Sequence, residues 1–208
     1  MDYKLFNDYL TVVISDAGAE LMSIKTRDGA EYLWQGNAEF WGGRAYNLFP
    51  ICGRIWEGKY TYKGKTYEGL KSPHGFIRKS VANEVNVLGD RCVEFIFKSD
   101  EETKKFYPFD FIYTLRYTLK ANRVVMSINV KNTGDNEMIF ALGGHPGFNV
   151  PIERGNFEDY YLDFEDGAEA KQVYMSDACF ATERLDKFRL EKGRILRLYH
   201  ELFDRDAI

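Results

Sequence analysis

The chain has 208 residues, a net charge of −4 at pH 7, and hydrophobic side chains at 45% of its positions. This length and composition suit a single globular domain with a sizeable core, and they exclude disordered and fibrous proteins. The 28 basic residues are interspersed among 32 acidic ones, whereas a nucleic-acid-binding protein concentrates its basic side chains on one face. We therefore expect no nucleic-acid partner.

No stretch of the sequence approaches the ~20 apolar residues that cross a bilayer, and the first residues lack the apolar core of a targeting segment. Cys52, Cys92 and Cys179 lie far apart, without Cys-x-x-Cys spacing. This pattern argues against a disulfide framework and favours a reducing compartment. We expect a cytoplasmic protein with no membrane partner, and the sequence leaves its oligomeric state open.

Short runs in which apolar and polar residues alternate predict strands along the whole chain. In chain order, the expected strands are residues 10–14, 20–25, 32–34, 59–62, 65–68, 85–88, 92–97, 111–119, 124–130, 138–142, 160–164 and 195–199. Helical periodicity is weak, and the best short candidates are 38–41 and 177–181. The pattern predicts an all-β chain that forms one large antiparallel sandwich, without internal repeats or a domain boundary.

The clearest of these elements is the hairpin of residues 111–119 and 124–130. In its first strand the odd positions are large and apolar or aromatic, while most even positions are polar. This alternation is typical of an antiparallel sheet with one buried face. The 16 Phe, 14 Tyr and 3 Trp of the chain suit such half-buried strands. Some of these rings are alternatively a platform for the apolar face of a sugar.

Three segments break the alternation with residues that a plain core would not contain. The first, residues 47–55, begins with Asn47 and has Arg54 near its end, with a mostly apolar stretch between them. An arginine side chain presents a planar fork of five donors, which suits an oxygen-rich ligand. A surface salt bridge is the alternative explanation for Arg54.

The other two segments each set a histidine beside proline and glycine. Residues 72–78 read Ser-Pro-His-Gly-Phe-Ile-Arg and contain His74, and residues 143–151 read Gly-Gly-His-Pro-Gly-Phe-Asn-Val-Pro and contain His145. Proline and glycine favour tight loops, and loops at strand ends often carry functional groups. Of the three histidines only His200 lacks this setting. His74 and His145 are therefore the candidates for acid–base chemistry, with a structural role as the alternative for each.

Five stretches of the chain, taken in order, resemble the aldose 1-epimerase (galactose mutarotase-like) superfamily, especially its LacX-like branch. They are Tyr-Leu-Trp-Gln-Gly at 32–36, Leu-Phe-Pro-Ile-Cys-Gly-Arg at 48–54, Pro-His-Gly-Phe at 73–76, Tyr-Pro-Phe-Asp-Phe at 107–111, and the 143–151 segment. Each stretch alone is weakly specific. Together they cover nearly the whole chain and form a specific signature.

The resemblance implies a β-supersandwich fold, a sugar substrate, and interconversion of α and β anomers at C1 without a metal or cofactor. By position, His145 matches the family's general acid, which protonates the ring oxygen as the pyranose opens. His74 matches a histidine that hydrogen-bonds the same sugar. Arg54 matches the arginine that holds sugar hydroxyls, and Asn47 and Asp206 are further expected sugar contacts.

The family's catalytic base is a glutamate near the C-terminus, and the resemblance puts it beyond Ile208. We therefore expect a single aldose 1-epimerase-like domain over residues 1–208 that is incomplete at its C-terminus and lacks its last strands. A phosphosugar is also open as the substrate, with Arg44, Arg54 or Arg78 as the residue that binds phosphate.

Two other functions compete with the isomerase. A carbohydrate-binding or sugar-sensing domain would keep the cleft and lack the base. A metal enzyme would use His74 and His145 as ligands. Such a site needs three or four ligands, and sandwich metal sites usually pair histidines as His-x-His, a spacing that the sequence lacks.

Overall fold

The computed structural model describes residues 1–165, 171–187 and 189–204. The chain divides into two compact units, Met1–Asn149 and Val150–Ile208. Strands form most of the regular structure, and the one α-helix of the described residues has six residues. The chain is all-β, as the alternating pattern of the sequence predicts.

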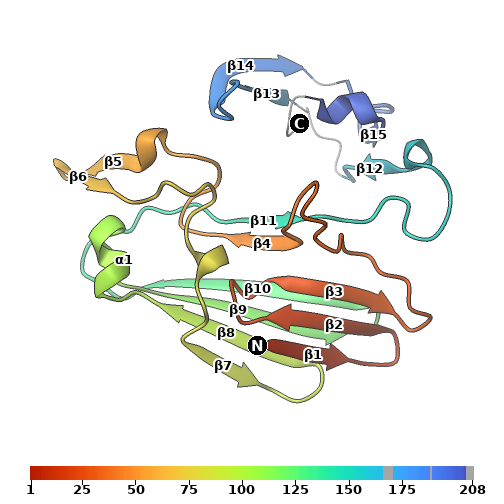
Figure 1. Cartoon of the computed structure of the whole chain (residues 1–208), viewed down its shortest axis with the longest axis horizontal. Helices are drawn as coiled ribbons and strands as arrows, with labels where there is room; N and C mark the ends of the chain where they lie inside the picture. Colours follow the sequence, from red (N-terminus) through yellow and green to blue (C-terminus); the bar gives the residue numbers. More distant parts are fainter. Residues whose placement is uncertain (166–170, 188, 205–208) are drawn as a thin grey trace. The chain divides into compact units, whose positions relative to one another are not determined.

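Two antiparallel sheets form the body of the first unit (Figure 1). One sheet has the order β1-β2-β3 and the other the order β10-β9-β8-β7. The strands are β1 (Asp2–Phe6), β2 (Leu10–Ser15), β3 (Leu21–Thr26), β7 (Glu84–Val87), β8 (Cys92–Lys98), β9 (Phe111–Lys120) and β10 (Arg123–Asn132). Strand β1 was not expected from the sequence, and the bounds of the other six agree within one or two residues with the expected strands.

The two sheets share one hydrophobic core. Alternate residues of β2 and β9 are buried, and these side chains belong to a single cluster with those of β8. The buried members of the three strands are Leu10, Val12, Ile14, Val93, Phe95, Phe97, Phe111, Tyr113, Leu115, Tyr117 and Leu119. Each fully buried Val, Leu or Phe stabilises the fold by roughly 1.5–3 kcal/mol. The two sheets are therefore the layers of a sandwich.

Two short ladders complete the strands of this unit. Strand β4 (Ala45–Leu48) pairs with β11 (Gly143–Pro146), and β5 (Lys59–Tyr62) pairs with β6 (Lys65–Glu68). The 3-10 turn η1 (Trp56–Gly58) lies between β4 and β5, and η2 (Ile77–Lys79) lies between β6 and β7. The β5–β6 hairpin has the bounds predicted from the sequence.

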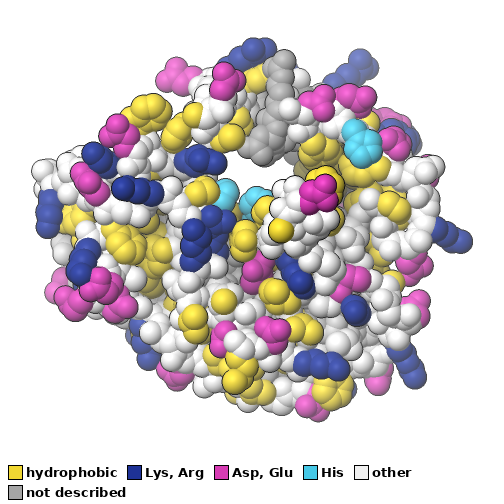
Figure 2. Space-filling model, viewed as in Figure 1, with side chains coloured by type: hydrophobic (Ala, Val, Ile, Leu, Met, Phe, Trp, Pro, Cys, Tyr) yellow, Lys and Arg dark blue, Asp and Glu magenta, His cyan; other side chains and the backbone are white. Residues whose placement is uncertain are grey.

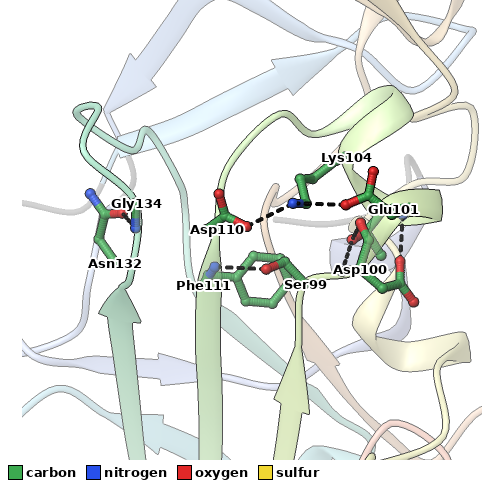
Figure 3. Close-up of polar contacts among 9 residues, drawn as sticks. Ser99, Asp100, Glu101, Lys104, Asp110, Phe111, Asn132 and Gly134 are labelled. Carbon is green, nitrogen blue, oxygen red and sulfur yellow. Dashed lines mark hydrogen bonds and ion pairs between the residues drawn. The ribbon is translucent and has the colours of Figure 1, made fainter.

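The helix α1 (Glu101–Phe106) was not expected from the sequence. Asp100 caps it, because its carboxylate accepts a hydrogen bond of 2.7 Å from the Thr103 amide. Lys104 lies 3.1 Å from Glu101 and 3.0 Å from Asp110, which ties the helix to the start of β9 (Figure 3). Six residues are too few for a helical period to show. The usable signal was the cap, with acidic residues in the first turn and lysines in the last.

Both helices that the sequence suggested are single turns. In residues 38–41, the amides of Phe40 and Trp41 both donate to the carbonyl of Asn37, and the two glycines that follow end the turn. Of residues 177–181, the first four lie in the connection between β13 (Lys171–Met175) and β14 (Ala181–Lys187), where the amide of Cys179 donates to the carbonyl of Ser176. Tertiary context overrides weak local propensity here.

Two predicted strands are also wrong. Within residues 32–34 only Leu33 forms an isolated bridge, because the Tyr32 amide donates to the carbonyl of Ile24 while the Trp34 amide donates to that of Gly147. Residues 138–142 have no ladder in the described structure. The carbonyls of Glu137 and Ile139 instead accept hydrogen bonds from tyrosine hydroxyls, each at 2.9 Å.

The second unit contains two small antiparallel strand pairs. Strand β12 (Tyr161–Asp163) pairs with β15 (Ile195–Arg197), and β13 (Lys171–Met175) pairs with β14 (Ala181–Lys187). The 3-10 turns η3 (Phe157–Asp159) and η4 (His200–Phe203) flank the first pair. A small cluster of Leu190, Leu196 and Leu202 is buried within this unit.

No helix in the described part of the chain is long and apolar enough to span a membrane. On the face drawn in Figure 2, basic and acidic side chains intermix rather than gather into a basic stripe. This distribution agrees with the interspersed charges of the sequence.

The core makes a first prediction about stability. Leu115 on β9 is fully buried, whereas Leu88 is 53% exposed after β7. We expect Leu115→Ala to lower the free energy of unfolding by about 2–5 kcal/mol, because it leaves a cavity between the sheets. The matched Leu88→Ala should change it by about 0.5 kcal/mol or less. Urea unfolding of both variants measures the difference, and equal losses would contradict this core.

Candidate functional site

Two hydrogen bonds with Gly53 hold His74 in place. The backbone amide of His74 donates to the Gly53 carbonyl at 2.7 Å, and the Gly53 amide donates to His74 Nδ1 at 3.1 Å. A protonated Nδ1 cannot accept a hydrogen bond. The ring is therefore neutral in this arrangement, with its proton on Nε2. The contact sets both the direction and the tautomer of the imidazole.

The backbone around His74 is tightly constrained. His74 has a φ of 65°, and Gly75 follows with a φ of 74°. Gly75 forms a parallel bridge with Phe49, and the amide of Phe76 donates to the Phe49 carbonyl at 3.1 Å. A methyl group on Gly75 would overlap that carbonyl. Glycine is required at this position because the His74 loop passes directly against the chain at Phe49.

His145 lies on a strand, not in the loop that the sequence suggested. It belongs to β11, where it pairs with Tyr46 of β4. Beyond the strand, the Gly147 amide donates to the Arg44 carbonyl at 2.7 Å, and the Gly147 carbonyl accepts from the Trp34 amide at 3.0 Å. Because hydrogen bonds reach this segment from two sides, the backbone that carries His145 is held rigidly.

The structure brings the two predicted histidines together. Their ring centroids lie 5.3 Å apart, with an angle of 71° between the ring planes. The His145 ring also packs on Trp41, at 4.9 Å and 37°. In the described part of the chain, neither ring nitrogen of His145 has a hydrogen-bond partner, and the residue is exposed to solvent. Both nitrogens are therefore available for proton exchange.

Of the three arginines considered for phosphate binding, two have partners within the protein. Arg44 donates through Nη1 to the Met22 carbonyl at 2.7 Å. Arg78 donates through Nη2 to Ser72 Oγ at 3.0 Å, and its guanidinium lies over the Tyr46 ring. Arg54 is exposed and makes no hydrogen bond or ion pair with any described residue. It is the immediate neighbour of Gly53, which holds His74.

Asn47 points into the protein rather than outward. It is 2% exposed, and its side-chain nitrogen donates to the carbonyls of Gly18 and Ala19, each at 2.9 Å, and to the hydroxyl of Tyr117 at 3.2 Å. Burial raises the pKa of the Tyr117 hydroxyl, which stays protonated and itself donates to Ala19. The side-chain nitrogen of Asn47 thus bonds to groups inside the protein. A sugar contact through the side-chain oxygen of Asn47 stays a prediction.

Asp206 is the last sequence candidate, and His200 is the third histidine of the chain. Asp206 lies outside the described residues, so its expected sugar contact stays a prediction. His200 belongs to the second unit, where its ring stacks on Phe157 at 4.6 Å. Among the described residues, no group of three or more His, Cys, Asp or Glu side chains could hold a metal ion.

An apolar cavity is lined in part by residues that directly precede Gly53 in the sequence. Its volume is about 440 Å³ and its lining does not include either histidine. It is lined by Pro50, Ile51, Cys52, Ile55, Tyr60, Thr61, Tyr62, Leu70, Tyr107, Phe109, Ile139, Phe140 and Ala141. Burial raises the pKa of the Cys52 thiol, so thiolate chemistry is disfavoured there at neutral pH. A polar hollow of about 240 Å³ lies near Asp110 and Asn132.

Comparison with known proteins places the chain. Its sequence matches the aldose 1-epimerase family over residues 1–187. The chain belongs to this family. It is 35% identical over 219 residues to the LacX proteins of Lactococcus lactis subsp. lactis, in both the plasmid and the chromosomal form. That match covers 100% of this chain and 71% of each relative.

Solved structures agree with the sequence match. The galactose mutarotase related enzyme of Lactobacillus acidophilus has a TM-score of 0.90 and 38% identity, over 99% of this chain and 68% of that one. A galactose mutarotase-like protein of Lactobacillus casei ATCC 334 also has a TM-score of 0.90, at 30% identity, over 99% and 70% of the two chains. These matches confirm the resemblance to the LacX-like branch and the galactose mutarotase-like sandwich.

Trp41 is the residue at this site that sequence reasoning missed. It lay in a short segment interpreted as a helix, and nothing in local spacing connects it with a histidine far along the chain. The Gly-Gly step at 42–43 was the available signal. A methyl group on Gly43 would overlap both Tyr46 and Trp41, so a glycine here indicates close packing of large rings.

The His74 loop makes a second prediction. Gly53 and Gly75 both have positive φ, but a methyl group on Gly53 would meet open space. We expect Gly53→Ala to cost about 1–2 kcal/mol of backbone strain. Gly75→Ala should cost about 1–3 kcal/mol more, because the added methyl collides with backbone, and it should displace the His74 ring. Urea unfolding and the imidazole NMR signals measure both effects. Equal losses in the two variants would argue against the close approach at Phe49.

Proposed function

We propose that this protein is an aldose 1-epimerase-like isomerase that interconverts the α and β anomers of an aldose by opening its ring. One observation carries the proposal: two imidazoles from separate segments lie 5.3 Å apart and differ in hydrogen bonding. Membership of the aldose 1-epimerase family supports a sugar as the substrate. The two rings suit two different tasks in the same reaction.

His145 is the proposed general acid. Ring opening needs a proton delivered to the ring oxygen and another removed from the C1 hydroxyl. Imidazole can give or take a proton near neutral pH. Because neither nitrogen of His145 is occupied in the described residues, this ring can deliver a proton and be recharged without breaking an internal hydrogen bond.

His74 is the proposed hydrogen-bond donor to the same sugar. Its Nδ1 accepts from the Gly53 amide, so Nε2 carries the proton. A positioned donor stabilises charge that develops on an oxygen during the reaction. Its neutral, fixed tautomer suits stabilisation better than proton delivery, because protonating Nδ1 would break the contact with Gly53.

Arg54 is the proposed contact to sugar hydroxyls, or to a phosphate if the substrate carries one. Its exposed guanidinium is free among the described residues and follows directly on Gly53. The resemblance assigns removal of the C1 hydroxyl proton to a glutamate base. Asp206 stays a proposed sugar contact.

The proposal extends to the whole chain. The family match covers residues 1–187 and so crosses the boundary between the two units at Asn149, which supports one aldose 1-epimerase-like domain. Free thiols at Cys52, Cys92 and Cys179 support a location in the cytoplasm.

The function is tested by mutarotation of freshly dissolved α-D-glucose and α-D-galactose, followed by polarimetry with the native gene product. We expect His145→Ala to reduce the catalysed rate by about 10²–10⁴-fold, because it removes the proton donor. The matched His200→Ala, at an exposed histidine of the second unit, should leave the rate unchanged. A native protein that matches the buffer rate with all common aldoses would refute the isomerase. Sugar binding measured by calorimetry in that case would indicate a binding domain instead.

Arg54 makes a separate prediction about substrate binding. We expect Arg54→Ala to raise KM by about 10–100-fold with a smaller change in kcat, since a hydrogen bond to a charged group contributes about 1.5–3 kcal/mol. Arg54→Lys should recover only part of the affinity, because lysine lacks the planar fork. The comparison of glucose with glucose 6-phosphate shows whether Arg54 binds phosphate. An unchanged KM for both sugars would remove Arg54 from the site.

A further inference from the structure

The imidazole of His145 makes no hydrogen bond with any described residue. A catalytic imidazole is usually oriented by a partner on its second nitrogen. His74 has such a partner in Gly53, but His145 has none in the described part of the chain. An exposed side chain in that state is free to change rotamer unless packing holds it.

Trp41 supplies the packing contact. Its ring lies 4.9 Å from the His145 ring, with 37° between the planes, so the two rings make a tilted contact. A ring contact of this kind occupies neither imidazole nitrogen with a hydrogen bond. It also persists when the imidazole becomes protonated, because the face of an indole attracts cations.

Trp41 is itself held by hydrogen bonds and by close packing. Its carbonyl accepts a hydrogen bond of 2.7 Å from Trp34 Nε1, and its amide donates to the Asn37 carbonyl at 2.9 Å. Its ring meets Tyr46 edge-on at 5.6 Å and 90°. A methyl group on Gly147 would lie 2.9 Å from Trp41 Cζ3. The indole therefore has little freedom to move away from His145.

We propose that Trp41 is the positioning residue for the general acid: its indole face orients the His145 imidazole while leaving both ring nitrogens free to exchange protons. The catalytic part of this statement rests on the proposed function. The orientation of the ring is independent of it and can be measured without a substrate. Tyr46 supports the same ring contact, because it contacts Trp41 and pairs with His145 across the β4–β11 ladder.

The first experiment measures the ring by NMR in the sugar-free protein. In the wild type, the ring current of Trp41 should displace the His145 Cε1–H and Cδ2–H signals, which are assigned by their loss in His145→Ala. We expect Trp41→Leu to move both signals to the positions of an exposed histidine, and Trp41→Phe to retain part of the displacement. The matched control is Phe40→Leu, since Phe40 is exposed and contacts Trp34 rather than His145. Unmoved His145 signals in Trp41→Leu would overturn the proposal, whatever the activity of the protein.

The second experiment separates positioning from sugar stacking. Trp41→Leu should lower kcat for mutarotation by about 10–100-fold and change KM by about twofold or less, because a misplaced acid slows the chemical step. Trp41→Phe should restore most of kcat. A rise in KM with kcat unchanged would mean that Trp41 is a platform for the sugar, and the proposal would fail.

A pair of glycine variants tests the packing around Trp41 without removing its indole. Gly147→Ala pushes against Trp41, whereas a methyl group on Gly144 would make only an ordinary contact, 3.8 Å from Pro146 Cδ. We expect Gly147→Ala to displace the His145 signals and lower kcat, and Gly144→Ala to do neither. Equal effects of the two variants would overturn the proposal. If the native protein has no mutarotase activity, the proposed function fails, while the NMR comparison still decides whether Trp41 orients His145.

Discussion

The site depends on how Phe49 anchors one short segment in the core. Phe49 is fully buried and stacks on Tyr113 at 4.8 Å and 30°. Its neighbour Leu48 pairs with Gly143 at the start of β11, and its own carbonyl receives the chain just after His74. Gly53, a few residues on, holds the His74 ring. One rigid segment therefore positions both imidazoles, although they are far apart in the sequence.

The two histidines are held by different physical means, and this difference divides their roles. A hydrogen bond from the Gly53 amide fixes the tautomer of His74 and keeps the ring neutral. The Trp41 indole packs against the His145 ring, and both His145 nitrogens are without a hydrogen bond in the described residues. The first arrangement suits a constant donor, and the second suits a group that changes its protonation state during a reaction.

Glycine is central to this arrangement because rings and backbone approach one another closely. Gly75 admits the Phe49 carbonyl, Gly43 admits the rings of Tyr46 and Trp41, and Gly147 admits the edge of Trp41. None of these contacts would survive an added methyl group without movement of backbone or of a large ring. The aromatic richness of the chain thus serves two purposes, filling the sandwich core and bracing the candidate site.

Alternation of apolar and polar residues was enough to predict the all-β class and most strands of the first unit. That pattern reflects burial of one sheet face, which is a local property with a period of two. The motifs around His74 and His145 identified the candidate pair through proline, glycine and a family resemblance. The helix α1 and the turn at 38–41 were misjudged because a few residues carry too little periodicity to separate a turn from a helix.

Contacts between distant segments could not be read in the same way. Three features of the site depend on contacts between residues that are remote along the chain. They are the short distance between the two imidazoles, the tautomer of His74, and the packing of Trp41 on His145. The inward direction of Asn47 likewise depends on carbonyls at Gly18 and Ala19. Local sequence determines which side of a strand is apolar, whereas packing of whole sheets determines which side chains meet, because that choice minimises buried unsatisfied groups and empty space across the entire core.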